Sequence, residues 1–140
     1  MVTTFMTCPH CIQVIVEDSV YCSYCRQKLI NKYGSTCLIT GHNTEAILEA
    51  AHIRAYKDGG TFDLSNGLLL RADIHTLFDL GLIAINPKTL KVEIYKSLQP
   101  TSYRELEDKH LLVQGDDLET PDKAALDEHY VQSQVRVEAQ

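Results

Sequence analysis

The sequence predicts an α+β fold in which a small metal-stapled unit precedes a core of short strands and helices. Three observations indicate this class. Four cysteines form two CxxC pairs near the N-terminus, strand-length apolar runs alternate with turn residues from residue 47 to residue 95, and helical segments follow from residue 101. With 140 residues and 44% hydrophobic content, the chain is long enough to bury one ordinary core.

The N-terminal cysteines predict a closed metal site. They are Cys8, Cys11, Cys22 and Cys25. Four thiolates suit a tetrahedral structural Zn²⁺, and such a site has no open position at which water could be activated. Residues 12–21 are rich in β-branched side chains around a polar break at residues 17–19, which predicts two strands and a turn. The unit resembles a zinc ribbon; two disulfides and a redox pair are the less favoured alternatives.

The segments that follow are expected in the order helix, strand, strand, helix, hairpin, helix, helix. Residues 26–34 predict a helix that Gly34 ends, and Cys37 is expected to be buried in a short strand that ends in a turn. The remaining ranges are strands at 47–53 and 66–71, a helix at 72–81, a hairpin of 82–86 with 90–95, and helices at 101–109 and from 120 to about 135.

Two of these segments carry helix-boundary signals. Thr101 or Ser102 is expected to cap the first C-terminal helix, and Pro121 is expected at the first position of the second. We therefore expect three parts: a zinc ribbon over residues 1–33, a core over 34–98 and an acidic helical extension over 99–140.

The charge is uneven along the chain. The formal net charge is −6, but residues 1–100 hold nine basic and nine acidic side chains, whereas residues 101–140 hold four and ten. The overall acidity therefore says little about the core surface, and a nucleic-acid partner is not excluded. The acidic extension is a candidate contact for a protein partner, and its removal is expected to leave the core folded.

Neither a membrane span nor a secretory signal is expected. No apolar run approaches the roughly 20 residues of a membrane helix, and the first residues lack a basic segment followed by an apolar one. We expect a cytoplasmic protein without a membrane partner.

One stretch of the core offers a set of side chains for phosphodiester hydrolysis. A His at 52, an Asn at 66 and a His at 75 fall on the first predicted strand, the second strand and the helix after it. A neutral imidazole can accept a proton from water at cellular pH, and a second imidazole can hold a cation that neutralises charge on phosphate oxygens. A residue four positions later on a helix shares its face.

The surrounding motifs resemble those of the HNH endonucleases, whose core is the ββα-metal fold. They read Cys-x-x-Thr-Gly at 37–41, Leu-Glu-Ala-Ala-His-Ile at 48–53, Asn-Gly-Leu-Leu-Leu at 66–70 and His-x-x-Phe-Asp at 75–79. The resemblance extends over residues 37–92 and implies a nuclease that hydrolyses DNA. Small nucleases of this kind often serve phage or antiphage defence systems.

The resemblance implies a role for each motif residue. His52 would be the general base, Asn66 would orient the ring of His52, and His75 would bind the catalytic cation, Mg²⁺ or another divalent ion. Many members of the family have Asp or His directly before the base as a further ligand, whereas this chain has Ala51. The substitutes are Asp79, one helical turn after His75, and Glu49, which is the second choice.

Three basic residues near this set are candidates for phosphate contacts, with a solvated surface charge as the equal alternative. They are Arg54, Lys57 and Arg71. The histidines at 42, 110 and 129 are given no role. Two further hypotheses stay open: an inactive HNH-fold adaptor that binds nucleic acid or a protein through the ribbon and the acidic tail, and an active nuclease that relies on a partner for DNA targeting. The oligomeric state is open.

Overall fold

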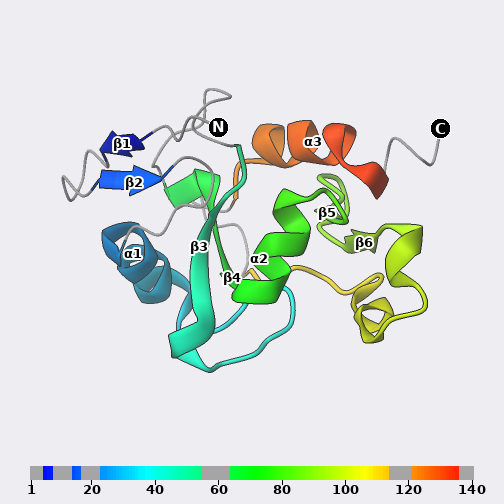
Figure 1. Cartoon of the computed structure of the whole chain (residues 1–140), viewed down its shortest axis with the longest axis horizontal. Coiled ribbons are helices and arrows are strands. Elements are labelled where there is room, and N and C mark those ends of the chain that lie inside the picture. The colour runs from blue at the N-terminus through cyan, green and yellow to red at the C-terminus, as the bar shows by residue number, and fades with distance from the viewer. Residues whose placement is uncertain (1–4, 8–13, 17–22, 55–63, 114–120, 136–140) are drawn as a thin grey trace.

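The structure is a computed structural model that describes residues 5–7, 14–16, 23–54, 64–113 and 121–135 (Figure 1). Its strands are β1 (Phe5–Thr7), β2 (Val14–Val16), β3 (Leu48–His52), β4 (Gly67–Arg71), β5 (Ile83–Ile85) and β6 (Val92–Ile94). Its α-helices are α1 (Ser23–Tyr33), α2 (Ala72–Asp79) and α3 (Lys123–Gln132). Short 3₁₀ turns η1 (Glu45–Ile47), η3 (Leu64–Asn66), η4 (Lys96–Leu98) and η5 (Ser102–Leu106) complete the order. The α+β class is confirmed.

The centre of the molecule is a ββα unit. Strands β3 and β4 pair antiparallel, with Leu48 opposite Arg71 and His52 opposite Gly67, and α2 follows β4 directly. Every residue of β4 except Arg71 is buried, because helices cover the hairpin on both sides: α1 and α2 lie on either side of β3 in Figure 1. The predicted pair of strands and the helix after them are confirmed.

Helix α1 packs closely against the start of β4. A Cβ atom on Gly67 would lie 3.2 Å from a methyl carbon of Leu29, so the glycine permits this approach. The Arg26 guanidinium donates to the carbonyl of Leu48 at 2.8 Å and also to that of Glu45. The helix that follows the second CxxC pair is thus tied to the first strand of the core.

The second hairpin and the C-terminal segments share this core. Strand β5 pairs antiparallel with β6, as predicted, and α3 packs against β5. Leu111 and Leu126 are fully buried, and Leu106 and Ala125 are nearly so, within the same hydrophobic cluster as Phe78. The expectation that residues 101–140 can be removed without harm to the core is wrong, because four of its buried side chains come from them. The boundaries of the three expected parts stay a prediction.

Two local predictions are corrected, and a third lies partly outside the described residues. Strand β2 pairs with β1, which precedes the first CxxC pair, whereas the predicted turn and strand after residue 16 fall outside the described residues. Helix α3 begins at Lys123 because the Asp122 carboxylate accepts from the Ala124 amide, so Pro121 lies before the cap. Residues 37–41 form a turn rather than a strand, and the Gly41 amide closes it on the carbonyl of Cys37 at 2.9 Å.

The other C-terminal helix is a 3₁₀ turn. Thr101 caps η5 as predicted, by accepting from the Tyr103 amide at 3.2 Å. Cys37 is fully buried, also as predicted. Within the described ranges, no helix is long and apolar enough to cross a membrane.

Candidate active site

His75 lies between two carboxylates. Its Nδ1 is 2.7 Å from Glu49 Oε1 on β3, and its Nε2 is 3.2 Å from Asp79 Oδ2, one turn later on α2. The imidazole is largely buried, and this burial lowers its pKa, but the hydrogen bonds and negative charges of Asp79 and Glu49 outweigh burial and raise it. The two acids that the sequence offered as metal ligands therefore both reach this ring.

His52 is the last residue of β3 and is influenced by the charges of His75 and Asp79. Burial lowers its pKa most, the neighbouring His75 lowers it further, and Asp79 opposes both. A lowered pKa keeps the imidazole neutral at cellular pH, as a general base requires. The hairpin and α2 thus bring His52, His75 and Asp79 within electrostatic reach of one another.

Asn66 is buried beside the end of β3. Its Oδ1 accepts from the Arg54 amide at 2.9 Å, and its Nδ2 donates to the Arg54 carbonyl at 3.0 Å. The Ile53 amide donates to the Asn66 carbonyl at 2.9 Å. This side chain therefore fixes the backbone directly after His52, and the orientation of the His52 ring by Asn66 stays a prediction.

Ala51, the position at which the resemblance led us to look for Asp or His, is fully buried in the hydrophobic cluster. It offers no ligand. Among the described residues, no three His, Cys, Asp or Glu side chains form a group that could hold a metal ion. Glu49 and Asp79 lie at opposite ring nitrogens of His75. One ring nitrogen of His75 could therefore bind an ion while the other is held by a carboxylate.

The segment that carries these side chains is similar to known nucleases. Residues 37–86 match the family model of an HNH endonuclease. This segment is similar to the HNH endonucleases. Its boundaries enclose β3, β4, α2 and β5, and hence His52, Asn66 and His75 of the candidate site. The resemblance seen in the sequence motifs is confirmed.

The HNH core and its flanks share a fold with a solved restriction enzyme. The match is to a "modification dependent TagI restriction endonuclease", with a TM-score of 0.61 and 19% sequence identity. It covers 95% of this chain but 52% of that one, so the chain spans about half the length of its structural relative. No curated protein matches the sequence.

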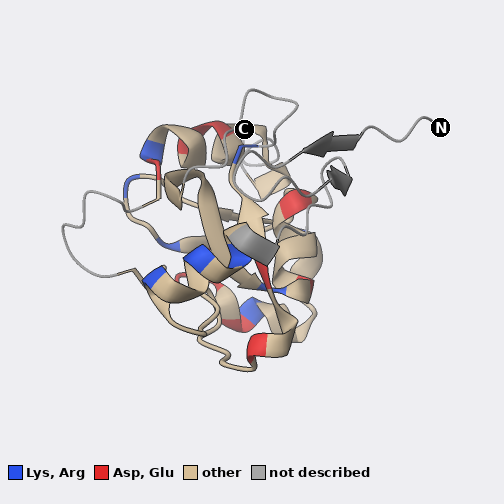
Figure 2. Ribbon diagram, turned by 90° about the vertical axis from the view of Figure 1, so that its left-hand side faces the viewer, with Lys and Arg blue, Asp and Glu red and all other residues tan. Residues whose placement is uncertain are grey.

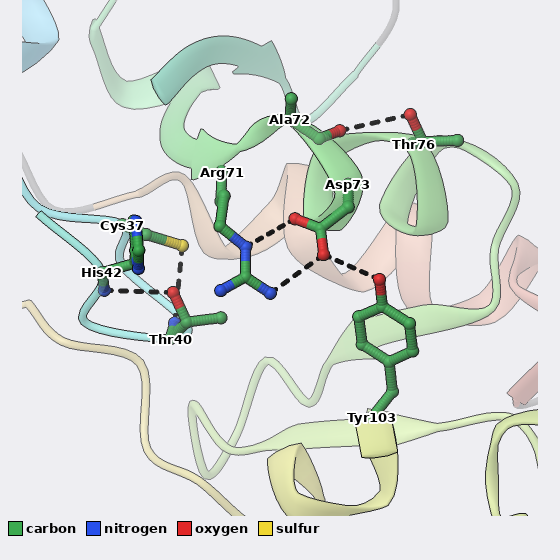
Figure 3. Close-up of polar contacts among 8 residues, drawn as sticks. All are labelled: Cys37, Thr40, His42, Arg71, Ala72, Asp73, Thr76 and Tyr103. Atoms are coloured by element: carbon green, nitrogen blue, oxygen red, sulfur yellow. Dashed lines mark hydrogen bonds and ion pairs between the residues drawn. The ribbon is translucent and has the colours of Figure 1, made fainter. Parts of the chain in front are cut away.

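Two of the three candidate phosphate contacts of the HNH core are paired with acids. Arg71 Nε and Nη2 donate to Asp73 Oδ1 and Oδ2 at 2.6 and 2.9 Å, and Tyr103 also donates to Asp73 (Figure 3). Arg54 Nε is 2.8 Å from Glu128 Oε2 on α3. Lys57 lies outside the described residues. Figure 2 shows basic and acidic positions interspersed along the described part of the ribbon in that view.

Only one of the four predicted zinc ligands lies in the described part of the structure. Cys25 is buried in the first turns of α1, whereas Cys8, Cys11 and Cys22 lie outside the described residues. The zinc site therefore stays a prediction.

One contact residue beside the HNH core was missed in the sequence. His129 on α3 stacks on Phe78 of α2, with ring centroids 3.7 Å apart and an interplanar angle of 6°. The available signal was helical spacing, since His129 follows the buried Ala125 by four residues and so shares its face.

Proposed function

We propose that the chain hydrolyses DNA phosphodiester bonds in a metal-dependent reaction with His52 as the general base. The observation that carries this proposal is that the β3–β4–α2 unit matches an HNH endonuclease model and holds Glu49 and Asp79 at the two ring nitrogens of His75. A neutral His52 would take the proton of the attacking water. The HNH family match supports nuclease chemistry, and DNA as the substrate is the class that this family implies.

We propose His75 Nε2 and Asp79 as protein ligands of the catalytic cation. Glu49, 2.7 Å from Nδ1, is then better suited to orient the ring than to bind the ion, because metal-ligating histidines usually donate their other N–H to a carboxylate. When bound, such a cation neutralises charge that develops on the phosphate and leaving oxygens. Imidazole and carboxylate together do not select between Mg²⁺ and other divalent ions.

Asn66 is proposed as a positioning residue. Its two hydrogen bonds to the Arg54 backbone hold the turn after His52, so the ring of His52 leaves the strand in a fixed direction. Phosphate contact by Arg54 or Arg71 would require each guanidinium to exchange its carboxylate partner for the DNA backbone.

A nicking assay tests this function. Supercoiled plasmid is incubated with the purified chain and Mg²⁺, Mn²⁺ or Ni²⁺, beside His52→Ala and an EDTA control. The matched control is His110→Ala, since His110 is exposed and its Nδ1 contacts the Leu111 carbonyl rather than a residue of the candidate site. We expect nicking by the wild type and His110→Ala alone; equal nicking by His52→Ala would refute the assignment.

A second candidate is a nuclease-fold adaptor, or a subunit that needs a partner to engage DNA. The pairing of Arg54 with Glu128 and of Arg71 with Asp73 favours it, because both cations are already neutralised. Folded wild-type protein that fails to nick with every metal would support this candidate over the first. Restoration of nicking by a DNA-targeting partner would then separate the subunit from the adaptor.

We also propose a structural Zn²⁺ on Cys8, Cys11, Cys22 and Cys25. The burial of Cys25 at the start of α1 supports it, because α1 is packed on the HNH hairpin and a closed metal site there would tie the N-terminal strands to the core. Elemental analysis should find about one zinc per chain in the wild type and none after Cys8→Ser. Full zinc content in that variant would end the proposal.

A further inference from the structure

Helix α3 holds the end of the helix that carries the proposed metal ligands. His129 Nε2 donates to the Phe78 carbonyl at 2.8 Å, and the His129 ring stacks on the Phe78 ring. Close by, the Gln134 amide donates to the Gly81 carbonyl at 2.9 Å. These contacts come from residues outside the segment that matches the HNH family model. One is made to the last turn of α2 and the other to Gly81, directly after its C-cap residue.

The bonded carbonyl belongs to the residue directly before Asp79. Carbonyls in the last turn of a helix lack partners within the helix, so such ends fray unless other groups bond them. The Phe78 carbonyl accepts from the Gly81 amide at 3.0 Å as well as from His129, and its ring is fully buried. A ring stack and a hydrogen bond on one residue thus fix the backbone from which the Asp79 carboxylate extends toward His75.

The His129 ring is held in one neutral form. Donation from Nε2 leaves Nδ1 as an acceptor, and Nδ1 is buried without a hydrogen-bond partner among the described residues. Burial lowers the pKa of His129, and the Phe78 carbonyl and the Asp79 charge only partly oppose this. A neutral ring adds no positive charge beside a site for a cation.

We propose that His129 is a positioning residue of the HNH site: through Phe78 it fixes the last turn of α2, so that Asp79 stays within reach of His75 Nε2. The inference rests on the proposed function, since it assumes that Asp79 and His75 bind the cation. It assigns a role in the site to a residue of α3, which lies in the part of the chain that the sequence predicted only as an acidic extension.

Two variants separate the ring stack of His129 on Phe78 from its hydrogen bond to the Phe78 carbonyl. His129→Phe keeps an aromatic ring on Phe78 and removes the donor, whereas His129→Gln keeps a donor and removes the ring. The matched control is Tyr130→Phe on the same helix, which removes the 2.9 Å bond from Tyr130 to Glu93 on β6 and leaves the end of α2 untouched. Circular dichroism and thermal unfolding of the full chain confirm that each protein is folded.

The first readout is Mn²⁺ binding, titrated by electron paramagnetic resonance with Mn²⁺ as the only ligand. We expect His129→Phe to weaken Mn²⁺ binding about tenfold, as loss of a partner that orients a ligand typically does. His129→Gln should recover most of the affinity, and Tyr130→Phe should bind as the wild type does. The second readout, in metal-free protein, is amide exchange at Leu80 and Gly81, which His129→Phe should accelerate and Tyr130→Phe should not.

The outcomes distinguish this inference from the proposed function. Wild-type protein that binds Mn²⁺ and nicks DNA, together with His129→Phe of unchanged affinity and unchanged exchange, would overturn the inference alone. Equal weakening by His129→Phe and Tyr130→Phe would also overturn it, because it would reduce His129 to general support of α3. Wild-type protein that neither binds Mn²⁺ nor nicks DNA would overturn the proposed function and, with it, this inference.

Discussion

Asp73→Asn tests whether the contact between Asp73 and Arg71 stabilises the start of α2. The hydrogen bonds from Arg71 lower the pKa of Asp73 most, burial raises it, and the bond from Tyr103 lowers it again, so that it falls from 3.8 to about 2. At about 1.36 kcal/mol per pKa unit, this drop corresponds to about 2.4 kcal/mol. The Asp73 side chain is 37% exposed, so solvent screening reduces the expected contribution to about 1 kcal/mol.

Because the pKa of Asp73 is lowered in the folded protein, its ionisation stabilises the folded state. The ionised Asp73 favours the folded state at every pH above 3.8, and its contribution is lost as the pH falls from 3.8 toward 2. Because Asn resembles the protonated acid, Asp73→Asn should lower the free energy of unfolding by about 1 kcal/mol at pH 7, with a smaller difference at pH 3.

Urea unfolding followed by circular dichroism measures this difference at each pH. The control is Asp127→Asn, which makes the same change of charge at an exposed position on α3. If the free energy of unfolding falls by less than about 0.5 kcal/mol at pH 7, the usual range of surface substitutions, the contact between Asp73 and Arg71 does not stabilise the protein. A loss that is equal at pH 7 and pH 3 would show that charge is not its source.

Three further predictions concern the base, the core and the DNA contact. The acid limb of the pH–rate profile of nicking should lie below pH 6.5, because burial lowers the pKa of His52; a limb at or above 6.5 would contradict the described environment. Leu126→Ala should cost roughly 2–5 kcal/mol of stability in urea unfolding, since the side chain is fully buried, and a loss under about 1 kcal/mol would show that α3 is dispensable. Glu128→Gln should release Arg54 and tighten DNA binding. The slope of the logarithm of the binding constant against the logarithm of the salt concentration, measured by fluorescence anisotropy, should steepen by about one phosphate contact. An unchanged slope would mean that Arg54 does not reach DNA.

The motif residues could be predicted because their local spacing is short and repetitive. The strand pattern around His52, the Asn-Gly step before β4 and the four-residue spacing of His75 and Asp79 all translate directly into a ββα unit. The same local logic placed the β5–β6 hairpin and the Thr101 cap. It did not predict β1, because the period of one strand carries no information about which segment pairs with it.

The partners of charged side chains could not be predicted in this way. Arg54 pairs with Glu128, 74 positions later, and Tyr103 reaches Asp73 across 30 positions. The bond from Asn66 to the Arg54 backbone also depends on how the chain turns after β3. Such contacts are set by packing of distant segments, and nothing in local periodicity encodes them.

Residue types and spacing within about thirty positions were enough to predict the strand–strand–helix order, and the resemblance of these motifs to the HNH endonucleases pointed to the catalytic candidates. How the acids divide around His75, with Glu49 at Nδ1 and Asp79 at Nε2, became visible in the folded chain alone. The tertiary structure also decided that α3 belongs to the core and carries His129 against Phe78. The physical reason is that burial and hydrogen bonding at these positions are made by side chains from separate elements, which meet only when the chain has folded.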